Sequence, residues 1–172
     1  MVLIYSFLQP DSREIIVPVS KDGEELPRTY VDAAYSWSYD KKGMLTHMIQ
    51  ADRLRYFTSS DESHLQKPRF FSRHDNDTTW SAFADVGKLL HSVDKLELNN
   101  DVVLLNDTTK GQLETESMLI DIKRQVATSE VPITFNQDSN SMRADSMVTN
   151  LRSKQLRLRG HVEGVYVSVN QP

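Results

Sequence analysis

The feature that most constrains the fold is a two-residue alternation of apolar and polar side chains along most of the 172-residue chain. In YVDAAYSWSYDKKG, from Tyr30, apolar or small residues occupy every second position from Val31 to Tyr39, namely Val31, Ala33, Tyr35, Trp37 and Tyr39. Residues 40–43 then predict a hairpin turn with Gly43 at a left-handed position. Shorter alternating stretches are TTWSAFAD, SMLIDI and VPITF. No window of twelve residues has a convincing helical stripe, and strand is favoured over helix at 85–93, so the pattern predicts an all-β, antiparallel chain.

A longer repeat is superimposed on this alternation. A small residue or Thr followed by an acid occurs about every 30 residues, at Ala51-Asp52, Ala84-Asp85, Thr115-Glu116 and Ala144-Asp145. Each unit consists of short strands that cannot bury an apolar face alone. Stacked units predict an elongated, twisted antiparallel sheet folded on itself as an open β-roll.

Composition narrows the class of protein. The net charge of -4 argues against a general nucleic-acid binder, and the absence of cysteine excludes disulfides. We expect one domain over residues 14–172. Residues 1–13 include the apolar run Val2–Leu8, which is too short to span a bilayer. We interpret residues 1–13 as the stub of a membrane anchor or as a flexible lead-in.

Patterns typical of catalysis or metal binding are weak. The five histidines have no metal-ligand spacing, and the calcium-loop resemblance at DNDTTW fails because Trp80 replaces the required Gly. Glu114 and Glu116 share a strand face, which we interpret as solvated. GKLL at Gly87 lacks the upstream Gly of a phosphate loop. We therefore expect neither an enzyme nor a cofactor.

The remaining candidate for function is the apolar interior of the roll. The expected inward stripes are ordinary core in the simplest interpretation, but together they could also hold acyl chains, because each buried methylene contributes about 0.8 kcal/mol. The stripes contain Trp37, Trp80, Phe83, Leu98, Ile120, Ile133 and Phe135.

Three stretches carry a resemblance to a known family. LPRTYVDAAYSWSYDKKGMLTHMIQADRLRYF, TTWSAFAD and the segment from VATSE to NLRSK resemble the LptC family of Gram-negative lipopolysaccharide export proteins over residues 14–170. The resemblance implies a non-catalytic, periplasmic β-jellyroll that is anchored in the inner membrane by an N-terminal helix, here missing or truncated. It further implies transfer of lipopolysaccharide from the LptB/LptF/LptG complex to LptA through an apolar groove for lipid A acyl chains.

The resemblance also implies residue roles. Groove positions are Ala34, Leu65, Trp80, Phe83, Ile120 and Ile133. Ala34 and Leu65 depart from the Thr and Phe common in the family, and Gln137 replaces a Gly of some members. Leu156 and Tyr166 fall on the edge facing LptA, and Val31 and Tyr35 on the edge facing LptF/LptG. Homodimer formation is a further association to test.

The C-terminal segment NLRSKQLRLRGHVEGVYVSVN supports the edge interpretation. Arg157 and Arg159 alternate with Leu156 and Leu158, as on edge strands that avoid self-pairing. A solvated face of a terminal hairpin is the simpler alternative. Two other functions stay open: a soluble LptA-like carrier that oligomerises end to end, and a closed β-roll scaffold or carbohydrate-binding domain.

Overall fold

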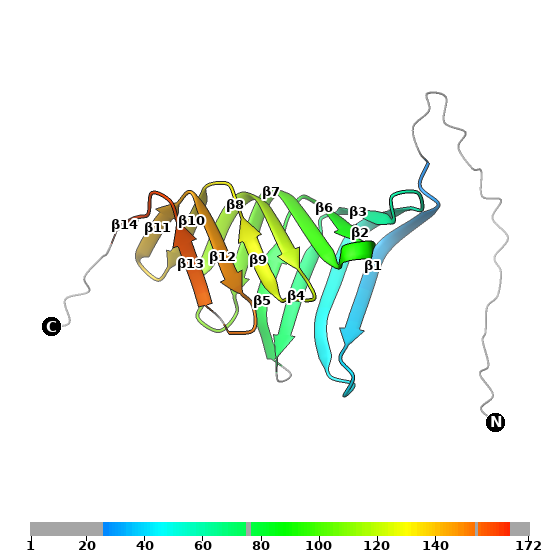
Figure 1. Ribbon diagram of the computed structural model, residues 1–172, viewed down its shortest axis with the longest axis horizontal. Helices are drawn as coiled ribbons and strands as arrows, with labels where there is room; N and C mark the ends of the chain where they lie inside the picture. Colours follow the sequence, from blue (N-terminus) through cyan, green and yellow to red (C-terminus); the bar gives the residue numbers. More distant parts are fainter. Residues whose placement is uncertain (1–25, 75–76, 154, 166–172) are drawn as a thin grey trace.

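The computed structural model describes residues 26–74, 77–153 and 155–165 (Figure 1). Within these residues the chain forms fourteen β-strands and one 3-10 helix, and every strand pairing is antiparallel. The elements are β1 Thr29–Tyr39, β2 Leu45–Phe57, β3 Glu62–Gln66, β4 Arg69–His74, β5 Asp77–Phe83, β6 Val86–Leu90, η1 His91–Val93, β7 Lys95–Asn106, β8 Gln112–Asp121, β9 Val126–Ser129, β10 Ile133–Gln137, β11 Asn140–Ala144, β12 Ser146–Asn150, β13 Gln155–Arg159 and β14 Glu163–Val165.

The strands form one sheet folded into two walls. The long strands β1, β2, β7 and β8 run through both walls, and β2, β7 and β8 change neighbours on the way. For example, β2 pairs with β4 over residues 47–50 and with β3 over residues 53–57. Wall A contains β4, β5, β10, β11, β14 and one half of each long strand, and wall B contains β3, β6, β9, β12, β13 and the other halves. The expected elongated, antiparallel roll is confirmed.

The two walls meet along a corner seam marked by the repeated small-acid pairs. Ala51, Ala84, Thr115 and Ala144 are buried inside the seam, whereas the acids that follow them lie on its outer side. A small side chain is required there because the two walls converge and leave little volume. Backbone hydrogen bonds join neighbouring corners, as from Asp85 N to the Asn100 carbonyl at 3.0 Å.

The hairpin turns lie on the side opposite the seam, where the two walls end. The turn after β1 confirms the expected left-handed glycine, because Gly43 has a φ of 78°. Asp40 caps this turn by accepting hydrogen bonds from the backbone N–H groups of Lys42 and Met44 at 2.8 and 2.9 Å. The region expected to be strand at 85–93 forms β6 followed by η1.

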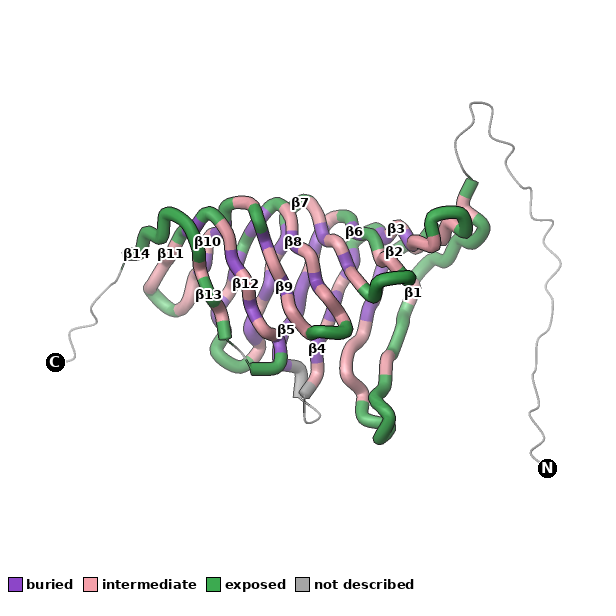
Figure 2. Tube along the Cα trace, in the orientation of Figure 1, coloured by how far each residue is buried: buried purple, intermediate pink, exposed green. Residues whose placement is uncertain are grey.

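The roll is elongated, with a different sheet edge at each end (Figure 1). Among the described residues, β1 pairs only with β2 at one end, while β13 and β14 pair only with β12 and β11 at the other. Figure 2 shows that buried residues concentrate in the middle strands and exposed residues at both ends. No helix among the described residues has the length and apolarity needed to cross a membrane.

Candidate functional site: an apolar interior between two sheet edges

The interior between the walls is one continuous apolar cluster. It extends from Ile49 and Ala51 near β1 to Met147 and Leu151 near β13. In the middle of the roll its side chains are fully buried, and Leu96, Leu104 and Ile120 have no exposed surface. At the C-terminal end Leu156 and Leu158 are half-buried and pack against the same cluster. The interior is therefore packed in the middle and partly exposed at the C-terminal edge.

Four of the expected groove residues line this interior. Leu65 and Trp80 are 4% and 3% exposed, and Ile120 and Ile133 are equally buried. They come from β3, β5, β8 and β10, so both walls contribute. These positions are inside the roll, and their contact with lipid stays a prediction.

Ala34 lies on the edge strand β1, opposite Ala51 of β2. Directly opposed residues of an antiparallel pair share one face of the sheet, so Ala34 points toward the interior. It is half-buried because no further strand covers β1 among the described residues. Ala34 therefore belongs to the N-terminal rim of the interior.

Two of the expected inward aromatic residues point outward instead. Phe83 lies next to the buried Ala82 on β5 and so occupies the opposite face, where its ring makes an edge contact with Phe71 at 6.0 Å between centroids. Trp37 is 54% exposed, pairs with Met48 and stacks on Tyr35. Both expectations are corrected, because these two side chains lie on the face opposite the interior. In β1 the alternation is also interrupted at Ala33, which has a φ of 52° and no partner in the register with β2.

The inner face of wall A is layered from the seam to the open side. The first row holds mainly small residues at the seam, as described above. The second row is apolar and crosses the strands through Ile49, Phe70, Ala82, Leu104 and Leu113. A third row, near the hairpin ends, is polar and is formed by His47, Ser72, Trp80 and Asn106. The face therefore changes from apolar to polar toward the opening.

The polar row was not anticipated as a unit. His47, Ser72 and Asn106 stand far apart in the sequence and became neighbours only through the strand register. His47 stacks on Phe70 at 5.9 Å, and burial lowers its pKa while the negative charge of Asp94 opposes that shift. The sequence contains a polar residue at one inward position of each strand, but such a residue looks the same in the sequence as an exposed polar position.

The N-terminal edge presents exposed apolar side chains. Val31 and Tyr35 on β1 are 37% and 56% exposed. Tyr30 and Tyr39 on the same strand are also exposed. Val31 faces the half-buried Leu54, whereas Tyr35 lies on the outer face with Trp37. The structure therefore places both expected residues on an uncovered strand.

The C-terminal edge combines apolar and cationic side chains. On β13, Leu156 faces inward toward the core cluster, and the neighbouring Arg157 and Arg159 are exposed. This is the alternation expected from the sequence. Tyr166, the other residue assigned to this edge, lies outside the described residues.

Three of the four acids of the corner seam make surface ion pairs or hydrogen bonds. Asp52 pairs with Arg69 at 3.1 Å, and Asp85 pairs with Lys67. Asp145 accepts hydrogen bonds from the backbone N–H and the ring Nδ1 of His161 at 3.1 and 2.8 Å, which lower its pKa. Because these groups are largely exposed, the pairs contribute little stability.

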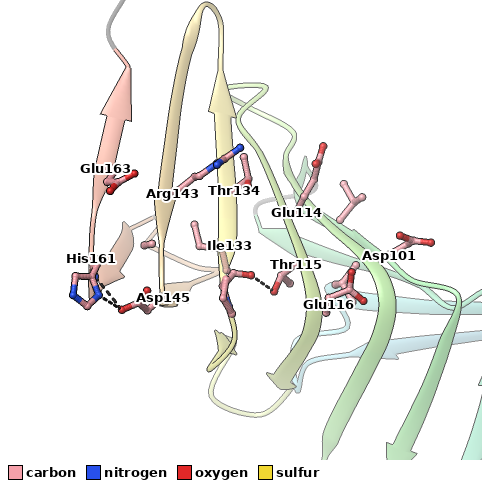
Figure 3. A pocket seen from close by; sticks show the side chains of 14 residues that line it. Asp101, Glu114, Thr115, Glu116, Ile133, Thr134, Arg143, Asp145, His161 and Glu163 are labelled. Atoms are coloured by element: carbon pink, nitrogen blue, oxygen red, sulfur yellow. Dashed lines mark hydrogen bonds and ion pairs between the residues drawn. The ribbon is translucent and has the colours of Figure 1, made fainter.

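A cleft of about 630 Å³ opens on the outside of the seam near β14 (Figure 3). A cross-strand row on the outer face of wall A lines it, with Glu114, Arg143 and Glu163 as its charged members. Glu114 and Glu116 are both exposed there, as expected for a solvated pair. The buried corner residues Thr115, Ile133 and Ala144 also line this cleft.

Comparisons with known proteins agree with this architecture. The family model described as "Lipopolysaccharide-assembly, LptC-related" matches residues 1–167. No curated protein sequence matches significantly. The chain is similar in fold to the crystal structure of LptH, the LptA-homologous periplasmic component of the lipopolysaccharide transport device of Pseudomonas aeruginosa. The TM-score is 0.56 at 7% sequence identity, covering 71% of this chain and 95% of the other. At that identity the likeness concerns the fold alone.

Proposed function

The chain belongs to the LptC family of lipopolysaccharide-assembly proteins, and from that premise we propose that its interior carries the acyl chains of lipopolysaccharide between two partner jellyrolls. A role in lipopolysaccharide transport, in the periplasm, follows from the family. The specific route, from the LptB/LptF/LptG complex to LptA, is the proposal. So is attachment to the inner membrane, because the expected anchor stub lies outside the described residues.

The observation that carries the proposal is an apolar interior that runs from one unpaired edge to the other. The core cluster includes residues near β1 and residues of β13, and no further described strand covers either edge. An uncovered strand offers free backbone N–H and carbonyl groups, so a partner can add its own strand there. Strand addition at both ends would extend the apolar interior into the neighbouring molecules.

The energetics favour acyl chains as the cargo. Each buried methylene contributes about 0.8 kcal/mol, so several chains outweigh the loss of some protein packing. The middle of the interior is filled by its own side chains, as Leu104 and Ile120 show. Lipid entry there therefore requires the two walls to separate on the open side, opposite the seam.

We assign the N-terminal edge, with Val31 and Tyr35, to the LptF/LptG partner and the C-terminal edge, with Leu156, to LptA. The exposed Arg157 and Arg159 support a C-terminal edge that avoids pairing with itself. The same two edges would also permit a homodimer, which makes the oligomeric state of the isolated chain a necessary control.

Site-specific photocrosslinking in Gram-negative cells tests the lipid assignment. A crosslinker replaces Trp80, which faces the interior, or Phe83, which lies on the other face of the same strand. We expect lipopolysaccharide adducts at position 80 and few at position 83. Adducts at neither position, in a folded chain whose edges still capture partners, would favour the closed scaffold over the carrier.

The same method tests the edges. A crosslinker at Leu156 should capture LptA, and one at Val31 should capture LptF or LptG, whereas one at the exposed Lys88 in the middle of the roll should capture neither. Equal capture at all three positions would contradict edge-specific docking.

A further inference from the structure

The polar row on wall A contains a buried hydrogen-bond donor without an acceptor. Trp80 is 3% exposed, and its indole Nε1 has no hydrogen-bond partner among the described residues. Buried polar groups are nearly always paired, because an unpaired one forfeits the hydrogen bond that it makes with water. A lone donor inside an apolar interior therefore calls for an acceptor that arrives from outside.

The neighbours of this donor are polar on both sides. In the strand register, Trp80 stands opposite Ser72 of β4 and Asn106 of β7, and Ser72 stands opposite His47 of β2. Ser72 and Asn106 are themselves buried. The row therefore places four polar side chains on one inner face, in line across four strands.

The row lies at a boundary between apolar and polar surroundings. Its neighbours one row closer to the seam are Ile49, Phe70, Ala82 and Leu104, which are all buried. On the other side of the row, the strands end in hairpins at the opening of the roll. A ligand with the same change of polarity along its length would match this arrangement.

The chemistry of the row selects among acceptors. Serine, asparagine and tryptophan side chains are uncharged, and burial lowers the pKa of His47, which favours its neutral form. An ionised phosphate at this depth would lose its hydration without gaining an opposite charge from the side chains of the row. A carbonyl oxygen needs only one neutral donor. The row is therefore suited to ester or amide carbonyl groups.

Resting on the proposed function, we propose that the polar row binds the linkage carbonyls of the acylated lipid, with the indole N–H of Trp80 as the principal donor. Ser72 and Asn106 flank this hydrogen bond, and the apolar row beside them receives the first methylenes of the chain. The row thereby sets how deeply an acyl chain enters the roll, and it discriminates acyl linkages from plain alkyl chains.

Nuclear magnetic resonance of the indole groups tests this inference directly. The chain has two tryptophans, so the exposed Trp37 is an internal control for Trp80. The ¹⁵N-labelled 172-residue chain is titrated with lauroyl glucose ester and, separately, with lauryl glucose ether, which lacks the carbonyl. The Trp37→Phe and Trp80→Phe variants assign the two signals.

We expect the ester to shift the Trp80 indole proton downfield, leave Trp37 unchanged and bind more tightly than the ether. Trp80→Phe keeps an aromatic six-membered ring but removes the pyrrole ring that carries the donor, so it should weaken ester binding roughly 2- to 10-fold and leave ether binding nearly unchanged. Equal shifts with both probes would overturn the inference while leaving lipid binding intact. Binding of neither probe would reject the proposed lipid function, and the inference with it.

Discussion

Truncation of Ile120 measures how tightly the interior is packed. Ile120 has no exposed surface and stands between Leu96 of β7 and Ala127 of β9 in the register. Replacing it with alanine leaves a cavity, because neighbouring side chains relax only partly, and such changes cost about 2–5 kcal/mol. For a chain of this size the melting temperature should fall by roughly 4–20 °C, at about 2–4 °C for each kcal/mol.

Leu119 provides a matched control on the same strand. It is adjacent to Ile120 but lies on the outer face, where it is half-buried. Leu119→Ala should therefore cost roughly 1 kcal/mol, since less apolar area is returned to water. Chemical denaturation of both variants, monitored by circular dichroism, gives the two free energies of unfolding.

Lipid should then distinguish the two variants further. A ligand that binds only the folded state stabilises it, by about 2.7 kcal/mol at a hundred times its dissociation constant. The cavity of Ile120→Ala lies in the proposed path of the acyl chain, so lauroyl glucose should restore more stability to this variant than to Leu119→Ala. Equal costs for both substitutions would refute the packed interior, and equal rescue would refute the proposed path.

Three further results are expected. Gly87→Ala should destabilise the fold by about 1–3 kcal/mol, because the added Cβ would lie 2.9 Å from the Glu97 carbonyl oxygen. Gly43→Ala, where a Cβ has open space, should cost only about 1 kcal/mol for its left-handed backbone, and thermal melts compare the two variants. Burial lowers the pKa of His47, so the unfolded chain binds the proton at a higher pH than the folded chain does. The free energy of unfolding should therefore fall as the pH drops below about 6.5. His47→Gln should reduce this pH dependence, as measured by denaturation at several pH values. Thr115→Val should cost about 1–3 kcal/mol in urea unfolding, because its buried hydroxyl donates to the Pro132 carbonyl at 3.0 Å.

The corners of the roll show how far the sequence could predict the fold. The spacing of Ala51-Asp52 and Ala84-Asp85 indicated a repeated unit, and the structure places those pairs where the sheet bends. Alternation alone did not reveal the bend, because residues on either side of it continue the same strand pattern. The small residue and the acid together carried the signal, since one fits the inside of a corner and the other its outside.

The inward face was less predictable than the strands. Trp37 and Trp80 occur in similar alternating contexts, yet Trp80 is buried and Trp37 is exposed. A period of two places residues on two faces without saying which face is covered. Which face is covered depends on strands that are distant in the sequence and pair in the fold. β1 has only one neighbouring strand among the described residues, so its outer face with Trp37 stays exposed.

The two uncovered edges of the roll carry different kinds of side chains, so the two ends of the molecule are not equivalent. Arg157 and Arg159 alternate with the inward leucines of β13, so two copies pairing through β13 would bring like charges together. The opposite edge carries Tyr35 and Trp37, aromatic side chains that favour contact with a partner. Self-pairing through the cationic edge is disfavoured, whereas pairing between unlike edges is not. This asymmetry fits the proposed head-to-tail docking of related jellyrolls, in which the apolar interior would continue from one molecule to the next.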